Sequence, residues 1–218
     1  MQTDKVERPT LGPYEELFAG VGGAFYVKHG KRIFDVAISL MLLPIVGAVA
    51  LGLAILNPIF SPGGLFYVQQ RMGHRCLPFR AIKFRTMTAN GTITRGADAP
   101  LETERITKLG ALLRKTRVDE LPQIINVLRG EMSLIGPRPD YITHARHYLR
   151  VVPGYRKRHD VLPGISGLAQ TEIGYVSSIE ETRDKVAADL RYIRELDFKM
   201  DFYVFKRTLQ TVLSYRGQ

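Results

Sequence analysis

The chain has 218 residues, of which 45% are hydrophobic, and this predicts one folded domain with appendages and a sizeable apolar core. Its 31 lysines and arginines outnumber its 21 acidic residues, and the formal net charge of +10 indicates an anionic partner: a nucleic acid, a membrane surface or a phosphorylated substrate. The single cysteine, Cys76, excludes an internal disulfide and suits a reducing compartment.

Residues 1–27 mix charges, prolines and glycines without a sustained period, so we expect a flexible arm. They are not typical of a cleaved signal peptide, because the apolar run comes after them and has no small-residue cleavage site close behind it. The folded part is therefore expected to begin near residue 28.

Residues 33–56 form an apolar run that contains one charge, Asp35. A straight helix of this length would measure about 36 Å, against about 30 Å for the hydrocarbon core, so a tilted membrane span is one interpretation. However, Pro44 and Gly47 predict a kink inside the run, and basic residues flank it at both ends. A spanning helix carries its positive loops on one side only. We therefore favour a re-entrant helix over residues 28–60, which returns to the membrane face that it entered, with the span as the alternative.

A β-hairpin is predicted after this helix. A turn at residues 61–64 is followed by a strand-like run over residues 65–68, and residues 79–87 alternate well enough to form the partner strand. Lys83 and Arg85 of the second strand are candidates for binding a phosphate. A solvated strand face is the alternative for both.

Two adjacent carboxylates, Asp119 and Glu120, follow an amphipathic helix that is predicted from residue 102 and ends in Arg114-Lys115. They stand at a predicted helix start, because Pro122 is tolerated only in a first turn. Free N–H groups and the positive end of a helix favour an anion there, either a carboxylate or a phosphate. Such a pair is often no more than a helix cap.

The arginines around this pair favour more than a cap. Arg114 and Arg117 precede the carboxylates, and Arg138 follows between two prolines that stiffen the backbone. Arginine side chains match phosphate oxygens with two parallel hydrogen bonds. A carboxylate nucleophile, a carboxylate for a hard cation and arginines for phosphates are parts suited to phosphoryl transfer.

Three ordered motifs resemble those of the bacterial sugar transferases, and more narrowly those of the monotopic polyprenyl-phosphate phosphoglycosyl transferases. They are Asp-Glu-Leu-Pro-Gln at residues 119–123, Gly-Glu-Met-Ser-Leu-Ile-Gly-Pro-Arg-Pro at 130–139 and Pro-Gly-Ile-Ser-Gly-Leu-Ala-Gln at 163–170. The likeness begins at Lys31 and continues nearly to the C-terminus. Several ordered motifs in one chain are far more specific than any one of them.

The resemblance implies transfer of a sugar-1-phosphate from a nucleotide diphosphate sugar, expected to be a UDP-sugar, to polyprenyl phosphate. The implied route is covalent: Asp119 attacks the sugar-proximal phosphorus, and the lipid phosphate then displaces the aspartate from an aspartyl phosphosugar. The resemblance also implies Mg²⁺ held by Glu120 and phosphates clamped by Arg114 and Arg138. We add Arg117 to these phosphate ligands from its proximity. The expected nucleotide loop contains Pro163, Gly164, Gly167 and Gln170.

The expected fold is α+β and mostly helical. It consists of a flexible arm over residues 1–27, a kinked re-entrant membrane helix over 28–60 broken at Pro44 and Gly47, and a cytosolic α/β catalytic domain over 61–218 with a β-hairpin and interfacial amphipathic helices. The expected location is the cytoplasmic face of the bacterial inner membrane. Membrane lipid is an expected partner beside the two substrates, nucleic acid is not, and a homodimer is left open.

Two further segments each allow two interpretations. His144 and His147 have a helical i, i+3 spacing but no evident third ligand, so a basic surface facing water or lipid is favoured over a metal site. The apolar stripe at residues 202, 205, 209 and 212 predicts a helix that lies either in the core or in the lipid headgroups.

Two other functions also remain open. A membrane-anchored module that binds an anionic ligand is supported by the net charge, but it leaves Asp119, Glu120 and the Gly-Pro-Arg-Pro run unexplained. A scaffold without catalysis is disfavoured because the charged residues of the motifs are all present. The sequence does not select the sugar, the base or the glycan pathway.

Overall fold

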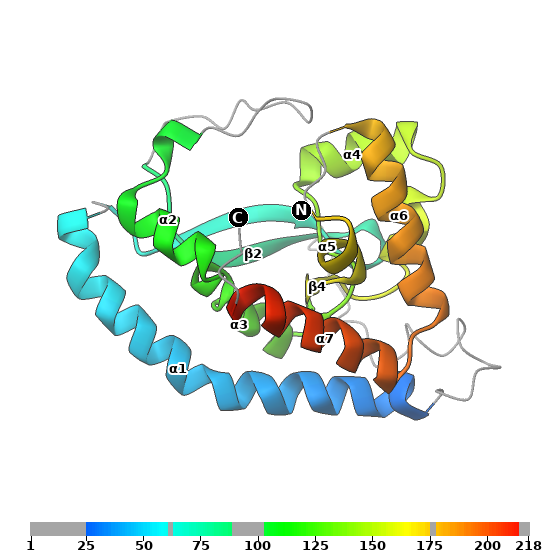
Figure 1. The fold of residues 1–218 in the computed structure, drawn as a ribbon, viewed down its shortest axis with the longest axis horizontal. Helices are drawn as coiled ribbons and strands as arrows, with labels where there is room; N and C mark the ends of the chain where they lie inside the picture. The colour runs from blue at the N-terminus through cyan, green and yellow to red at the C-terminus, as the bar shows by residue number, and fades with distance from the viewer. Residues whose placement is uncertain (1–24, 61–62, 89–102, 175–177, 214–218) are drawn as a thin grey trace, which may run out of the picture.

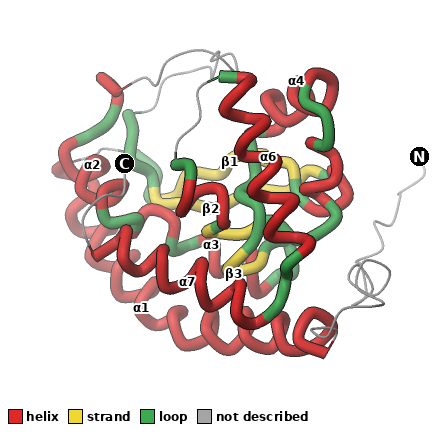
Figure 2. The backbone as a smooth tube through the Cα atoms, turned by 45° about the vertical axis from the view of Figure 1, so that its right-hand side comes forward, coloured by secondary structure: helices red, strands yellow, loops and turns green. Residues whose placement is uncertain are grey.

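The computed structural model describes residues 25–60, 63–88, 103–174 and 178–213. Helices dominate these residues, and the strands form two small two-stranded sheets (Figure 2). The predicted α+β class, mostly helical with a hairpin and one long apolar helix, is therefore confirmed. Most of the predicted arm over residues 1–27 lies outside the described residues.

The elements follow one another in short steps along the chain. A π-helical turn, η2 (Tyr26–Gly30), leads into the long helix α1 (Lys31–Phe60). The hairpin comprises β1 (Phe66–Met72), the 3-10 turn η3 (His74–Cys76) and β2 (Pro78–Phe84). The middle of the chain forms η4 (Thr103–Arg105), α2 (Lys108–Lys115), η5 (Val118–Glu120), α3 (Gln123–Leu128) and β3 (Ser133–Ile135). The C-terminal part forms α4 (Ile142–Val151), η6 (Tyr155–His159), β4 (Gly164–Ser166), α5 (Leu168–Glu172), α6 (Ile179–Arg194) and α7 (Phe198–Leu213).

Both predicted hairpin strands exist, but their ends differ from the prediction. β1 and β2 pair antiparallel from Phe66 opposite Phe84 to Met72 opposite Pro78, so the first strand is longer and the second is shorter than expected. Just past Phe84 the Arg85 N–H still donates to the Leu65 carbonyl at 2.9 Å, and then the Thr86 carbonyl accepts from the Thr107 N–H at 3.1 Å. This pairing fastens the end of the hairpin to the start of α2.

Residues 163–170, predicted to be a loop, contain a strand and the first turns of a helix. β4 pairs in parallel with β3, with Ser133 opposite Gly164. A Cβ added at Gly164 would overlap the backbone of Gly136, so glycine is needed there for the close approach of two chain segments. The pairing lays β4 beside the Gly-Pro-Arg-Pro run that follows β3.

Helix α1 is one helix of 30 residues that contains both Pro44 and Pro58. Among the described helices it is the one that is long and apolar enough to cross a membrane, over Lys31–Pro58. Figure 1 shows that it runs along the base of the domain and then bends away from that line. Its internal charge, Asp35, accepts a hydrogen bond from the Leu134 N–H of β3 at 3.0 Å. Large apolar side chains that are more than half exposed along α1 are Ile33, Leu40, Met41, Ile45, Leu51, Ile55 and Phe60.

The first turn of α1 is fastened to the domain by charged side chains. Lys31 forms a buried ion pair with Asp201 of α7 at 2.6 Å and donates to the Ile135 carbonyl at 2.9 Å. Arg32 donates to the Val127 carbonyl near the end of α3 at 2.7 Å. The start of the apolar helix is therefore tied to α7, to the end of α3 and to the end of β3.

Helix α7 lies beside α1 in both ribbon views (Figures 1 and 2). Asp201 and Val204 are buried, whereas Phe202 and Leu209 are about half exposed. The predicted stripe at 202, 205, 209 and 212 is therefore only in part a core face: Phe205 packs against the core, whereas Phe202 and Leu209 are exposed. The reason is the ion pair with Lys31, which draws the Asp201 side of α7 inward and leaves an apolar side outside.

Candidate active site

Asp119 and Glu120 lie in the short turn η5 rather than in the first turn of α3, which begins only at Gln123. The chain enters η5 through Arg117, whose φ of 56° is left-handed and unfavourable for a residue with a Cβ. This turn reverses the chain after α2 and directs both carboxylates inward, where they are only 8% and 6% exposed. Backbone strain is thus stored at Arg117, within the short link between α2 and the carboxylate pair.

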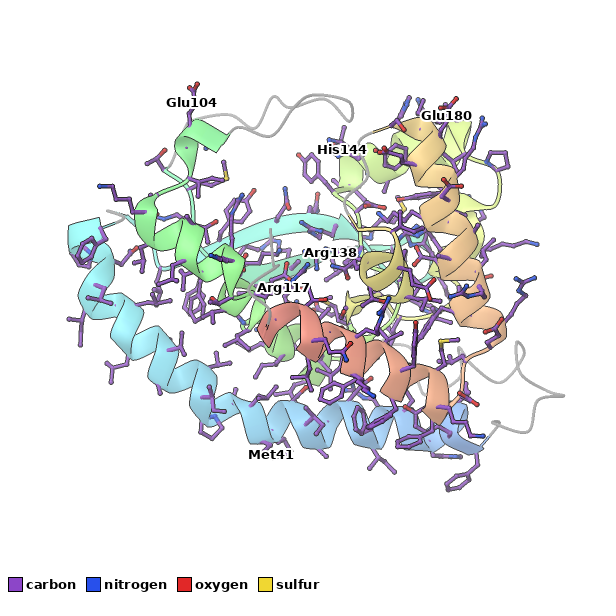
Figure 3. The ribbon with its side chains drawn as sticks, in the orientation of Figure 1. Met41, Glu104, Arg117, Arg138, His144 and Glu180 are labelled. Carbon is purple, nitrogen blue, oxygen red and sulfur yellow. The ribbon has the colours of Figure 1, made fainter. Side chains whose placement is uncertain are left out.

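Glu120 is surrounded by basic side chains from three parts of the chain. Lys83 of β2 lies 2.6 Å from Oε1, and Arg117 lies 3.6 Å from Oε2. Arg138 binds with both of its terminal nitrogens, one of which is 3.0 Å from Oε2. Figure 3 shows Arg117 and Arg138 close together in the middle of the domain. Burial alone would raise the pKa of Glu120, but Arg138 and Lys83 outweigh it and hold the pKa well below its usual range.

Asp119 has a different environment from its neighbour. Burial raises the pKa of Asp119, and the charge of Glu120 adds to the rise, whereas Lys83, Arg138 and Arg114 oppose it. Glu120 is therefore held firmly as a carboxylate, and the ionised form of Asp119 is the less stabilised of the two. Neighbouring carboxylates with opposed pKa shifts are suited to different roles in one reaction.

Of the two basic candidates in the second hairpin strand, Lys83 and not Arg85 reaches the carboxylates. The guanidinium of Arg85 packs against Gly63 instead. Burial lowers the pKa of Lys83 to about 8, although Glu120 opposes this shift. Lys83 is therefore a cation that loses its proton close to physiological pH.

Arg114 and Arg138, the two arginines expected from the family resemblance to bind phosphate, are held by different parts of the fold. The Nε of Arg114 donates to the Thr86 hydroxyl at 2.9 Å, so α2 and the end of the hairpin hold this side chain near Asp119. Arg138 also donates to the Ile165 carbonyl of β4 at 3.0 Å. The structure thus brings four of the five predicted basic residues, all except Arg85, to the carboxylate pair; that they bind phosphate stays a prediction.

The predicted nucleotide loop lies beside Arg138, but its backbone is hydrogen-bonded to neighbouring segments and packs closely against them. The Pro163 carbonyl accepts from the Ser133 N–H at 2.9 Å, and the Gly164 N–H donates to the Pro137 carbonyl at 3.0 Å. Gly167 stands just before α5, and a Cβ there would overlap the Gly136 carbonyl. Gln170 is partly buried on α5, and its Oε1 has no hydrogen-bond partner among the described residues. Nucleotide binding by these residues stays a prediction.

Sequence reasoning missed Asn126, which lies within the apolar stripe of α3. Its Oδ1 accepts from the Ile82 N–H at 3.1 Å, and its Nδ2 donates to the Arg80 carbonyl at 2.7 Å and to Glu131 at 2.6 Å. These bonds fix α3 against β2 and so bring Glu120 within reach of Lys83. A polar residue between isoleucine and valine in a short helix was the available signal.

It also missed Arg71, which shares a face of the hairpin with Lys83. Strand alternation places Tyr67, Gln69 and Arg71 on one side of β1, and Tyr67 is directly opposite Lys83. Arg71 lies close enough to Arg138 and Glu120 for their charges to shift its pKa, after the larger effect of burial, which lowers it. We call the following residues the site cluster: Asp119, Glu120, Lys83, Arg71, Arg114, Arg117 and Arg138.

The described residues contain no group of three or more histidine, cysteine, aspartate or glutamate side chains placed to hold a metal ion. His144 makes an edge-to-face contact with the ring of Tyr141, and α4 lies at the end of the domain opposite the first half of α1 (Figure 1). The basic-surface interpretation of His144 and His147 is therefore favoured, and any metal in the site cluster depends on Asp119 and Glu120.

Comparisons with known proteins agree with the sequence motifs. A family model described as bacterial sugar transferase matches residues 26–215. A UDP-N-acetylgalactosamine-undecaprenyl-phosphate N-acetylgalactosaminephosphotransferase of Aeromonas hydrophila is 38% identical over 187 residues, which cover 86% of this chain and 44% of that protein. A UDP-glucose:undecaprenyl-phosphate glucose-1-phosphate transferase of Caulobacter vibrioides is 36% identical over 186 residues, 84% of this chain and 70% of that protein.

A third relative is similar in length to this chain. The exopolysaccharide production protein PSS of Rhizobium leguminosarum bv. phaseoli is 36% identical over 194 residues, which cover 86% of this chain and 96% of that protein. By contrast, the chain spans less than half of the Aeromonas relative. The sugars in the names of the relatives differ, so these names do not choose a sugar for this chain.

Proposed function

The chain belongs to the bacterial sugar transferase family, and from this premise we propose that it transfers a sugar-1-phosphate from a UDP-sugar to a polyprenyl phosphate. The observation that carries the proposal is the site cluster, in which two buried carboxylates meet five basic side chains. Such a cluster is suited to a diphosphate, because arginine and lysine bind phosphate oxygens strongly when both are desolvated. The names of the relatives supply the donor and acceptor classes.

The proposed route has two displacements at one phosphorus. An Asp119 carboxylate oxygen forms a bond to the sugar-proximal phosphorus, and the bond from this phosphorus to the bridging oxygen breaks, so that UMP leaves with the bridging oxygen and its electron pair. An oxygen of the polyprenyl phosphate then attacks the same phosphorus, and the Asp119 carboxylate is released. Two steps let an aqueous donor and a lipid acceptor use one site in turn.

The basic side chains need a partner when no phosphate is present, and Glu120 provides it. Lys83, Arg117 and Arg138 all lie against its carboxylate. We propose that these three side chains exchange Glu120 for phosphate oxygens when the donor binds. The cations are then already in place, which avoids much of the cost of organising them during the reaction.

The donor set fits a magnesium ion. Mg²⁺ is usually bound through one or two carboxylates together with substrate phosphates and water, and Asp119 and Glu120 are two adjacent carboxylates of this kind. Glu120 would hold the ion once its basic partners have moved to the phosphates. When bound, the ion supplies neutralising charge for the diphosphate, which otherwise repels the attacking carboxylate.

We also propose that α1 is a re-entrant membrane helix on the cytoplasmic face of the bacterial inner membrane. Its exposed apolar side chains favour lipid contact, and Pro44 and Gly47 favour a bend within the run. The exposed Phe202 and Leu209 of α7, which lies beside α1, suit a helix in the headgroup layer. This arrangement holds the site cluster near the depth of the acceptor phosphate without a membrane crossing.

Intact-protein mass spectrometry of detergent-solubilised protein tests the proposal. The protein is mixed with Mg²⁺ and, separately, with UDP-glucose, UDP-N-acetylgalactosamine and other UDP-sugars, without lipid. The expected result is a mass increase of one sugar phosphate with one donor, which is lost in Asp119→Asn and retained in Asp184→Asn, an exposed carboxylate on α6.

The other outcomes separate the alternatives. Turnover of polyprenyl phosphate without any adduct would mean direct displacement, with Asp119 as a base or a metal ligand. Neither adduct nor turnover with a complete donor panel would favour the membrane-anchored anionic-ligand-binding module or the scaffold without catalysis.

A further inference from the structure

The segment that carries Arg138 is held in place mainly through its carbonyl groups. Pro137 and Pro139 have no N–H to donate, so the usual ladder of backbone hydrogen bonds cannot fix this segment from both sides. Among the described residues, backbone donors reach only its two ends: the Pro137 carbonyl accepts from the Gly164 N–H at 3.0 Å, and the Asp140 carbonyl accepts from the Met72 N–H at 3.1 Å.

The two carbonyls between these ends are bound by guanidinium groups. Nη2 of Arg158 donates to the Arg138 carbonyl at 2.8 Å, and Nη1 of Arg71 donates to the Pro139 carbonyl at 2.6 Å. Four consecutive carbonyls therefore each accept a hydrogen bond, and the two central ones depend on arginine side chains from distant parts of the chain.

The two arginines differ in their own surroundings. Arg158 is 1% exposed and forms ion pairs with both Asp140 and Asp189, so its charge is neutralised locally. The hydrogen bonds of Arg71 go to neutral groups, the Pro139 carbonyl and the Gln69 Oε1 at 3.0 Å, and its buried Nε has no hydrogen-bond partner among the described residues. Glu120 and Asp140 lie near enough to favour the charge of Arg71, but burial and Arg138 outweigh them. The contact through which Arg71 affects the Arg138 segment is its hydrogen bond to the Pro139 carbonyl.

We propose that Arg71 is a positioning residue for Arg138: by binding the carbonyl of the next residue, it holds the backbone that aims the Arg138 guanidinium at the substrate phosphates. The inference rests on the proposed function, because it takes Arg138 as a phosphate ligand. Arg71 acts through Arg138, so its removal has a large effect only while Arg138 is present.

A double-mutant cycle on phosphate binding tests this proposal without knowledge of the sugar. The affinity of the full-length protein in detergent for inorganic pyrophosphate is measured by calorimetry for the wild type, Arg71→Met, Arg138→Ala and the double variant. We expect Arg71→Met to weaken binding about tenfold in the wild type, and by less than about twofold when Arg138 is already absent. Arg80→Met, which removes an exposed cation from the same hairpin, is the matched control and should leave the affinity unchanged.

Each outcome decides something. Equal losses in both backgrounds would overturn the positioning role and leave the proposed transferase intact, because Arg71 would then act on its own or through general destabilisation. A wild-type protein that does not bind pyrophosphate would overturn both the positioning role and the phosphate-binding interpretation of the site cluster. If Arg71→Met does not fold, Arg71→Gln replaces it in the same cycle, since its shorter side chain also loses the bond to Pro139.

Discussion

Two clusters of buried charges share the Arg138 segment, one through Arg138 and the other through Asp140, and they differ in charge balance. The balanced cluster has two acidic and two basic residues, Asp140, Asp189, Arg158 and Lys185. The site cluster has two acidic residues and five basic ones. A cluster whose charges cancel needs no further partner and serves the structure, whereas a buried excess of positive charge is stable only with an anion. The difference therefore separates a structural cluster from the one that we propose binds the substrate.

The balanced cluster shows the tight geometry expected of structural ion pairs. Lys185 lies 2.6 Å from Asp140, and Arg158 lies 2.7 Å from Asp189. Burial alone would raise the pKa of Asp140, but Lys185 and Arg158 outweigh it and hold the pKa far below its usual range. Tyr155 donates to the same carboxylate at 2.7 Å. The cluster joins α6 and η6 to the residue directly after the Gly-Pro-Arg-Pro run.

The largest expected effect is on activity and comes from the site cluster. Asp119→Asn should lower sugar-phosphate transfer by about 10⁴-fold or more, because the proposed nucleophile is removed. Since burial raises the pKa of Asp119, its charge is unfavourable in the folded state at neutral pH, and the variant should unfold at a higher temperature than the wild type. Turnover assays and thermal unfolding in detergent measure the two effects. A variant that is inactive and also unfolds at a lower temperature than the wild type would contradict the assignment of Asp119 to the reaction rather than to stability.

The balanced cluster should show the largest effect on stability. Arg158→Met leaves Asp140 and Asp189 without their shared cation, and removing one partner of a buried ion pair costs about 3–5 kcal/mol. Denaturant unfolding of the variant and the wild type measures the difference in unfolding free energy. A loss below about 1 kcal/mol would mean that this cluster does not have the structural role assigned to it.

Glu120→Gln sharpens the comparison, because it increases the excess of positive charge in the site cluster. We expect the free energy of unfolding to fall by about 1–3 kcal/mol at pH 7, since Lys83 and Arg138 lose a charged acceptor. The folded-state pKa of Glu120 is depressed, so its contribution is present above the unfolded pKa of about 4.3 and is lost as the pH falls below it. The difference in unfolding free energy between the variant and the wild type, measured by denaturant unfolding, should therefore become smaller below about pH 4.

Added pyrophosphate provides the control for this variant. It should raise the unfolding temperature of Glu120→Gln more than that of the wild type, because a ligand stabilises the state that it binds and Glu120 no longer competes for the cations. An equal rise in both proteins would argue against the exchange of Glu120 for phosphate oxygens.

A smaller effect should appear in the pH dependence of activity. Because burial lowers the pKa of Lys83 to about 8, the value of kcat/KM for the UDP-sugar should fall about tenfold per pH unit above pH 8. In Lys83→Arg the fall should disappear, since arginine keeps its proton. The same shift predicts that the unfolding free energy rises between pH 8 and about 10.4, where the unfolded chain binds more protons than the folded one. A pH profile without a fall in the wild type would show that Lys83 does not bind the donor.

The smallest effect is expected outside both clusters. Arg191 and Glu172 form an ion pair at 2.6 Å whose side chains are 41% and 26% exposed. Because water and salt screen such a pair, Arg191→Ala should change the unfolding free energy by less than about 1 kcal/mol. Comparing this loss of unfolding free energy with that of Arg158→Met shows how much of the effect comes from burial of the ion pair.

The sequence alone determined the features that depend on neighbouring residues. The long apolar run with Pro44 predicted a helix that is long enough for a membrane, and the alternation around Lys83 predicted a hairpin, because side-chain periodicity is a local property. Asp119, Glu120 and Arg138 were recognisable because their motifs are contiguous. The prediction was wrong where backbone partners are distant: residues 163–170 contain β4, which pairs with β3, rather than only a loop.

Only the tertiary structure decided which charges meet. Three contacts each join segments that are far apart in the chain: Lys83 with Glu120, Arg71 with the Pro139 carbonyl, and Lys31 with Asp201. Arg71 and Pro139 are 68 residues apart, and no pattern in either segment indicates the other. The physical reason is that the balance between desolvation and ion pairing depends on the surroundings in the folded state, which a local pattern does not contain.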